Sequence, residues 1–130
     1  MGSYKDLEIY KLSFNLAIKV HHLTMTLPKY ELYEQGSQVR RSAQSIKDNI
    51  AEGYGRRRYK AEYIRFLIFA HASCDEAINQ LEMINKLYFH DHPINDLIED
   101  YNVLGAKINR FIQYVESNWN TNPQPATRNP

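Results

Sequence analysis

The stretch that decides the fold is Leu97-Ile98-Glu99-Asp100-Tyr101-Asn102-Val103-Leu104-Gly105-Ala106-Lys107-Ile108-Asn109-Arg110-Phe111-Ile112-Gln113-Tyr114-Val115. Its large apolar residues are spaced alternately by four and three positions, at Leu97, Tyr101, Leu104, Ile108, Phe111 and Val115. This spacing places them on one side of an α-helix and is typical of the seam of an antiparallel helix bundle. We predict a helix that starts after Pro93, with Asn95 as its N-cap, and ends near Trp119.

Three further long helices are predicted before this stretch, because prolines and glycines fall almost entirely between periodic segments. Their predicted limits are residues 6–27, 37–53 and 60–88. Asp6 is the expected N-cap of the first helix, and Gly53 is the expected C′ residue of the second. Short connections join the helices.

No stretch alternates with the period of two that marks a β-strand. Four helices with short connections predict an all-α fold, an antiparallel up-down-up-down four-helix bundle. We assign this bundle domain to residues 4–119. The tail at residues 120–130 contains three prolines and no large apolar side chain, so we expect it to be disordered.

Two of the predicted helices carry more apolar surface than the core of one bundle needs. The first has two stripes on nearly opposite faces: Leu7, Tyr10, Phe14 and Ala17, and then Ile9, Leu12, Leu16, Val20, Leu23 and Leu27. The third also has two: Ile64, Leu67, His71, Cys74, Ile78 and Leu81, and then Phe66, Ala70, Ala77 and Ile84. The surplus either widens the core-facing arc or meets another subunit, and we expect self-association.

The composition of the 130 residues argues against several classes of protein. Apolar residues make up 43%, and no run approaches the roughly 18 consecutive apolar residues that span a bilayer. The amino terminus shows no secretory signal, and the single cysteine, Cys74, allows no internal disulfide. We therefore expect a cytoplasmic protein without a membrane partner.

Charge is unevenly distributed, although the net charge is only +1. Between Arg40 and Arg65 there are three acidic residues and eight basic ones: Arg40, Arg41, Lys47, Arg56, Arg57, Arg58, Lys60 and Arg65. Arg40 and Lys47 are seven positions apart, so we predict that they share one exposed face of the second helix. The turn into the third helix contains Arg56, Arg57, Arg58 and Lys60, interleaved with tyrosines.

Guanidinium groups suit phosphate oxygens, and tyrosine rings stack on unpaired bases. The sequence therefore predicts a patch that binds RNA or DNA, consisting of Arg40, Lys47, Arg56, Arg57, Arg58 and Lys60. The alternative is a solvated turn whose charges only neutralise acidic faces of neighbouring subunits.

The stretch Arg40-Arg41-Ser42-Ala43-Gln44-Ser45-Ile46-Lys47-Asp48-Asn49-Ile50-Ala51-Glu52-Gly53 resembles the R-R-x-x-x-S-I-x-x-N-I-A-E-G pattern of small bacterial proteins encoded within intervening sequences of 23S ribosomal RNA genes. Residues 4–10 and 62–81 are similar to the start and the third helix of that family. Lys47 departs from it where a proline is frequent. The resemblance covers about residues 4–118.

The resemblance implies a four-helix bundle that assembles into a ring-shaped homopentamer. More distantly similar proteins are accessory proteins of diversity-generating retroelements, which bind nucleic acid and a reverse transcriptase. No firm biochemical activity comes with the resemblance, so it implies fold and assembly more strongly than function.

No catalytic, cofactor-binding or metal site is predicted. His90-Asp91-His92 lacks a third metal ligand, and Cys74 is expected to be an inert thiol of the core. Arg41 is expected to pair with Asp75 or Glu76 of the third helix, in a polar lock between helices. The sequence thus predicts a non-enzymatic homo-oligomer that binds RNA or DNA, and the alternative is a scaffold that docks a protein partner without binding nucleic acid.

Overall fold

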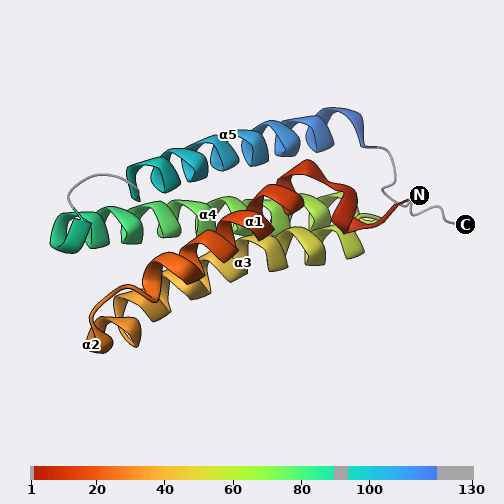
Figure 1. Ribbon diagram of the computed structural model, residues 1–130. Helices are drawn as coiled ribbons and strands as arrows, with labels where there is room; N and C mark the ends of the chain where they lie inside the picture. Colours follow the sequence, from red (N-terminus) through yellow and green to blue (C-terminus); the bar gives the residue numbers. More distant parts are fainter. Residues whose placement is uncertain (1, 90–93, 120–130) are drawn as a thin grey trace, which may run out of the picture.

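The computed structural model of the chain describes residues 2–89 and 94–119. Four long helices make up most of this part: α1 (Glu8–Thr24), α3 (Gln35–Gly55), α4 (Lys60–Ile84) and α5 (Ile94–Asn118). Three short elements join or extend them: a 3-10 turn (Tyr4–Asp6), α2 (Lys29–Leu32) and a π-helical turn (Asn85–Phe89). In Figure 1 the colours run along successive long helices in alternating directions. The predicted all-α four-helix bundle is confirmed, and the tail expected to be disordered lies outside the described residues.

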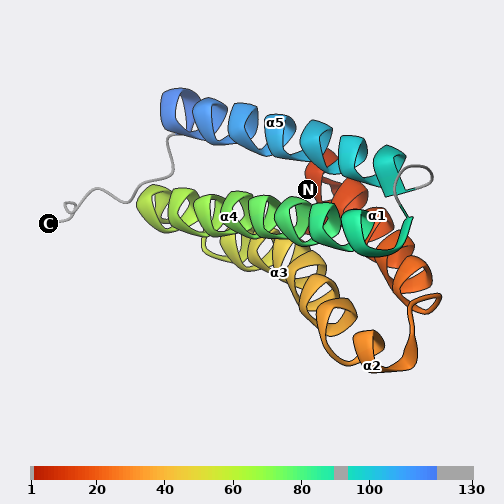
Figure 2. The same ribbon diagram turned by 90° about the vertical axis from the view of Figure 1, so that its left-hand side faces the viewer.

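The core is lined by the predicted seam of α5. Five of the six seam residues are buried: Leu97, Tyr101, Leu104, Ile108 and Val115. Phe111 is only partly buried, and its neighbour Ile112 is buried with the rest. Both views show α4 between α5 and α3 (Figures 1 and 2), and α1 closes the bundle against α3 and α5. The helices α1 and α4 therefore lie on one diagonal of the bundle.

Most of the second apolar stripe predicted on α4 faces the core. Ala70, Ala77 and Ile84 are buried together with Leu67 and Leu81. The wide core-facing arc therefore accounts for this part of the surplus. None of the described helices is both long and apolar enough to cross a membrane.

The helices α3 and α4 approach each other closely at Gly53. This residue is buried, and a Cβ atom built on it would lie 3.0 Å from the Cβ of Phe66. The prediction that Gly53 terminates its helix is wrong, because α3 continues to Gly55. The missing side chain serves helix–helix contact here rather than a left-handed cap.

Two predicted caps are also wrong. The Asp6 carboxylate accepts from the backbone N–H of Ser3 at 3.0 Å, which closes a capping box on the 3-10 turn, and α1 begins only at Glu8. Asn95 lies inside the first turn of α5, where its Oδ1 accepts from Nδ2 of Asn85 at 3.1 Å. Both side chains satisfy polar groups at helix ends, but from positions one or more residues away from the expected cap.

Polar side chains link α3 to α4, although not through the residues expected. The Ser42 hydroxyl donates to Oε1 of Gln80, and the hydroxyls of Ser45 and Ser73 share a hydrogen bond, both at 2.8 Å. Arg41, which was predicted to reach an acid of α4, instead donates to the Ser37 hydroxyl of its own helix at 2.7 Å. The polar lock exists, but it is uncharged.

A carboxylate joins the short helix α2 to the π-helical turn that follows α4. Glu31 is 9% exposed, and its Oε2 accepts from the Tyr88 hydroxyl at 2.7 Å and from Nε2 of Gln35 at 3.3 Å. The hydrogen bond from Tyr88 lowers the pKa of Glu31 and raises that of Tyr88. The ionised form of Glu31 is thus the one that the fold stabilises.

Glu31→Gln is expected to remove part of the acid sensitivity of the fold. Because the pKa of Glu31 is lower in the folded than in the unfolded state, its contribution is complete above the ordinary glutamate pKa of about 4.3. That contribution is lost as the pH falls through the lowered folded-state value. Urea denaturation midpoints across acidic pH should therefore fall less steeply for Glu31→Gln than for the parent. Glu34→Gln, which removes an exposed carboxylate nearby, should leave the steepness unchanged, and equal slopes for all three proteins would contradict the prediction.

Candidate nucleic-acid interface

The connection between α3 and α4 places the predicted cationic residues at one end of the bundle. We call residues 56–60 the basic turn. Its backbone is closed by hydrogen bonds from Arg56 N to Gly53 O at 3.0 Å and from Tyr59 N to Arg56 O at 2.9 Å. The chain therefore reverses direction tightly, and successive arginines leave the turn close together.

The carboxyl end of α5 anchors the basic turn. The indole Nε1 of Trp119 donates to the Arg57 carbonyl at 2.8 Å, and the Lys60 ammonium donates to the Glu116 carbonyl at 2.7 Å. The Arg57 guanidinium carbon lies 3.9 Å from the centre of the Tyr54 ring, within cation–π distance. Contacts to two other helices thus hold the turn in place.

A cluster of aromatic rings lies beneath the turn. Tyr63 is buried, and its ring packs edge-to-face against Tyr54, Phe111 and Trp119 at centroid distances of 6.4, 6.0 and 5.3 Å. Burial raises the pKa of Tyr63, so its hydroxyl stays protonated. Such edge-to-face contacts stabilise beyond simple burial and give the turn a firm support.

The charge of Arg56 is balanced at the surface by two carboxylates of the same chain. Its Nε lies 2.9 Å from Oε2 of Glu52, and its Nη1 lies 3.3 Å from Oε1 of Glu62. Its guanidinium also lies over the ring of Phe66, with 4.8 Å between the guanidinium carbon and the ring centre. The hydrogen bond to Glu52 raises the pKa of Arg56, which therefore stays charged but carries two anionic neighbours.

Arg58 and Tyr59 form the exposed part of the turn. The Arg58 guanidinium carbon is 5.9 Å from the centre of the Tyr59 ring, and Tyr59 is 50% exposed. Within residues 2–89 and 94–119, no carboxylate lies at ion-pair distance from Arg58. A cation and a flat aromatic face are therefore presented together to solvent.

Arg40 and Lys47 do not join the basic turn, and the prediction that they share an exposed face is wrong. Arg40 is half-buried, and it donates to Thr24 Oγ1 at 3.0 Å and to the Leu32 carbonyl at 2.8 Å. The Lys47 side chain is only 18% exposed and pairs with Asp48 at 2.9 Å. Arg40 thus ties the α1–α2 region to α3, because its long side chain reaches across the helix interface instead of outward.

A family profile described as 23S rRNA-intervening sequence protein matches residues 5–110. The chain belongs to this family. The match confirms the resemblance found in the sequence and spans the whole basic turn. No curated protein matches the chain.

The residues that hold the basic turn of this 23S rRNA-intervening sequence protein were not predicted from the sequence. Glu116 and Trp119 lie beyond the matched residues and are distant from the turn in the chain. Trp119 gave one usable signal, because it is the only tryptophan and directly follows the apolar seam of α5. Glu52 gave another, since it precedes Arg56 by four positions, the spacing of an ion pair on a helix.

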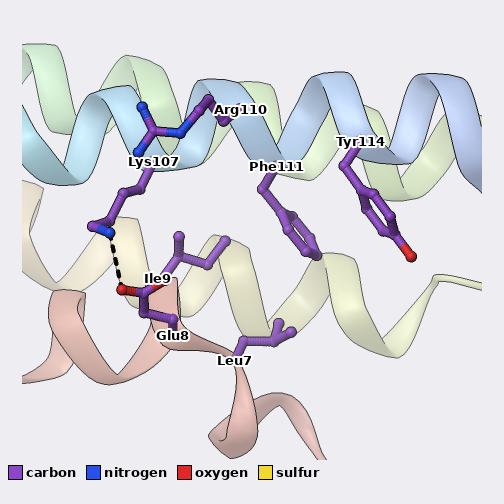
Figure 3. A pocket seen from close by; sticks show the side chains of 7 residues that line it. All are labelled: Leu7, Glu8, Ile9, Lys107, Arg110, Phe111 and Tyr114. Carbon is purple, nitrogen blue, oxygen red and sulfur yellow. Dashed lines mark ion pairs between the residues drawn. The ribbon is translucent and has the colours of Figure 1, made fainter.

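A separate groove of about 350 Å3 lies between the start of α1 and α5 (Figure 3). Lys107 reaches across it to Glu8, with 2.9 Å between Nζ and Oε2, while Leu7 and Phe111 line an apolar end. The Lys107–Glu8 pair bridges α5 and α1, and Arg110 adds a second, exposed cation to the lining of the groove.

The single cysteine of the chain belongs to the core. Cys74 is buried, its thiol donates to the Tyr101 carbonyl at 3.3 Å, and burial raises its pKa to about 12. It therefore stays protonated at neutral pH, as expected for a core thiol. No cluster of three metal-ligating side chains occurs in the described part of the chain. The His90-Asp91-His92 stretch lies outside that part.

Proposed function

We propose that this protein is a non-enzymatic homo-oligomeric four-helix bundle that binds RNA or DNA through its basic turn. The observation that carries the proposal is the exposed pair of Arg58 and Tyr59, in which an arginine without a carboxylate partner among the described residues lies beside a half-exposed aromatic ring. Arginine binds phosphate oxygens in a bidentate manner, and tyrosine stacks on a base that is not paired. We expect a preference for nucleic acid with unpaired bases.

The support beneath the turn favours binding without a large ordering cost. Trp119 and Lys60 fix the backbone of the turn, and Arg57 is held against Tyr54. A surface that is already ordered loses less conformational entropy when a ligand binds. Self-assembly, pentameric by resemblance to the family, would repeat the turn in every subunit and multiply weak phosphate contacts.

The triple variant Arg56→Ala, Arg57→Ala, Arg58→Ala is expected to weaken binding of single-stranded RNA by about tenfold or more. Each lost phosphate contact should also reduce the slope of log K against log salt by about 0.7 to 0.9. Fluorescence polarisation titrations over a range of salt concentrations measure both quantities. The matched control is Lys29→Ala, Lys86→Ala, Arg110→Ala, which removes three exposed cations elsewhere and should change the slope far less.

The emission of Trp119 reports whether the turn stays intact in these variants, because its indole contacts the backbone of Arg57. The double variant Arg58→Ala, Tyr59→Ala tests the exposed pair without removing the Arg57–Tyr54 contact. An unchanged salt slope with an intact turn would place the binding site elsewhere. Absence of binding by the parent at low salt would instead favour the protein-docking scaffold. The pairing of Arg56 with Glu52 and Glu62 supports that alternative, because it neutralises one cation of the basic turn.

A further inference from the structure

A polar groove of about 620 Å3 lies between α1 and α3, which pack side by side (Figure 1). The residues of α3 that line it recur at steps of three or four positions, so they share one face of the helix. The side chains placed to meet a ligand there are His21, Ser37, Arg40, Arg41, Gln44 and Asp48. Arg41 precedes Arg56 by fifteen positions, about 22 Å along a helix, so the groove is separate from the basic turn.

Two arginines of this groove have no acidic partner. Within residues 2–89 and 94–119, no carboxylate lies at ion-pair distance from Arg40 or Arg41. Asp48, the one acid among the described residues of the lining, pairs with the Lys47 ammonium at 2.9 Å. Glu76 of α4 lines a neighbouring groove together with Arg41, but it too lies beyond ion-pair distance. The lining therefore carries a positive charge that no described carboxylate pairs with.

Hydrogen-bond donors are already oriented in the groove. Nη1 of Arg41 donates to Ser37 Oγ at 2.7 Å, which positions the guanidinium and leaves the hydroxyl hydrogen of Ser37 to donate elsewhere. Arg41 is exposed, so its other N–H groups remain for a ligand. Gln44, one turn further along α3, is also exposed and adds an amide donor.

Arg40 contributes charge from the wall of the groove. It is half-buried, and its contacts to Thr24 and to the Leu32 carbonyl use two of its five N–H groups. Solvent and salt screen a partly buried charge less than an exposed one. Arg40 is thus a fixed positive charge behind the exposed guanidinium of Arg41.

We propose that this groove binds a phosphate group, with Arg41, Ser37 and Gln44 donating hydrogen bonds to its oxygens and Arg40 supplying positive charge. The planar guanidinium matches two phosphate oxygens at once. Two sources share this chemistry, a small phosphorylated molecule and the backbone of a nucleic acid. The site goes beyond the proposed function, because it uses no residue of the basic turn.

Arg41→Gln is expected to reduce the affinity for inorganic phosphate about tenfold or more, because it removes the charge and the fork of donors. Thermal unfolding midpoints are measured at rising phosphate concentration and constant ionic strength, since a ligand that binds only the folded state raises the midpoint. Arg41→Gln should need about tenfold more phosphate than the parent for the same rise. Ser37→Ala, which removes one donor and no charge, should lie between the two.

The matched control is Arg110→Gln, which removes an exposed arginine of α5. It should respond to phosphate like the parent, because the general stabilisation by phosphate, which is excluded from protein surfaces, acts on all variants alike. Equal rises for the parent and Arg41→Gln would show a general salt effect and overturn the site. An equal loss in Arg110→Gln would overturn it as well, because any surface arginine would then serve.

Adenosine 5′-monophosphate and single-stranded RNA without terminal phosphates distinguish the two sources. If Arg41→Gln weakens RNA binding and lowers its salt slope, the groove binds the nucleic-acid backbone. If it weakens only binding of the monophosphate, the ligand is a small phosphorylated molecule. A variant that binds both probes as tightly as the parent overturns the site. The triple variant of the basic turn should keep the parent's response to inorganic phosphate, so failure of the proposed function and failure of this groove are separate results.

Discussion

Leu104→Ala is expected to lower the free energy of unfolding by about 2–5 kcal/mol, the range found when a large aliphatic side chain is removed from a closed core. Leu104 is completely buried in the seam of α5, one turn after Tyr101 and one turn before Ile108. The loss has two parts, the transfer free energy of the deleted carbons and the cavity that the surrounding helices fail to fill. Ile108→Ala, at the next seam position, is expected to fall in the same range.

Chemical denaturation followed by circular dichroism measures this change, with the slope of the transition checked for two-state behaviour. The matched control is Val103→Ala, the neighbouring position, which is 42% exposed and should change stability by no more than about 0.5 kcal/mol. A loss under about 1 kcal/mol for Leu104→Ala would mean that α5 is not packed against the core in solution.

The helices and their buried faces were predictable because they depend on local periodicity. The 4–3 spacing of the seam identifies residues that share one side of a helix, and five of its six members are buried. Helix ends were harder, because a cap is set by one or two hydrogen bonds. Asn95 and Gly53 are residue types that commonly cap helices. Here Asn95 instead bonds to a residue of the π-helical turn, and Gly53 makes room for Phe66.

The candidate site was predictable in composition but not in arrangement. The run Arg56 to Arg58 marked the turn, since consecutive cations near a helix break are visible in the sequence alone. The inward direction of Arg40 depends on how far α1 lies from α3, and the anchoring of the turn depends on where α5 ends. Such contacts join residues far apart in the chain, and no local pattern encodes them.

The core also contains a group that works against stability. Tyr101 is completely buried, and its hydroxyl finds no hydrogen-bond partner among the described residues. Burial raises the pKa of Tyr101, since the phenolate has no compensation there. A buried hydroxyl that has left water without gaining a partner costs about 1–3 kcal/mol. The aromatic ring itself fills the seam and contributes to packing.

Tyr101→Phe is therefore expected to raise the free energy of unfolding by about 1–3 kcal/mol, because it removes the unpaired hydroxyl and keeps the ring. Thermal or urea denaturation measures the gain, and Tyr114→Phe, at a position 49% exposed, should leave stability unchanged. A second readout is alkaline pH. Because its folded-state pKa lies above the unfolded value, Tyr101 makes no pH-dependent difference to stability below the ordinary tyrosine pKa of about 10, and stability falls as the pH rises further. That fall should be smaller in Tyr101→Phe, whereas a loss of stability at neutral pH would mean that the hydroxyl is hydrogen-bonded after all, to a buried water molecule between α5 and its neighbours.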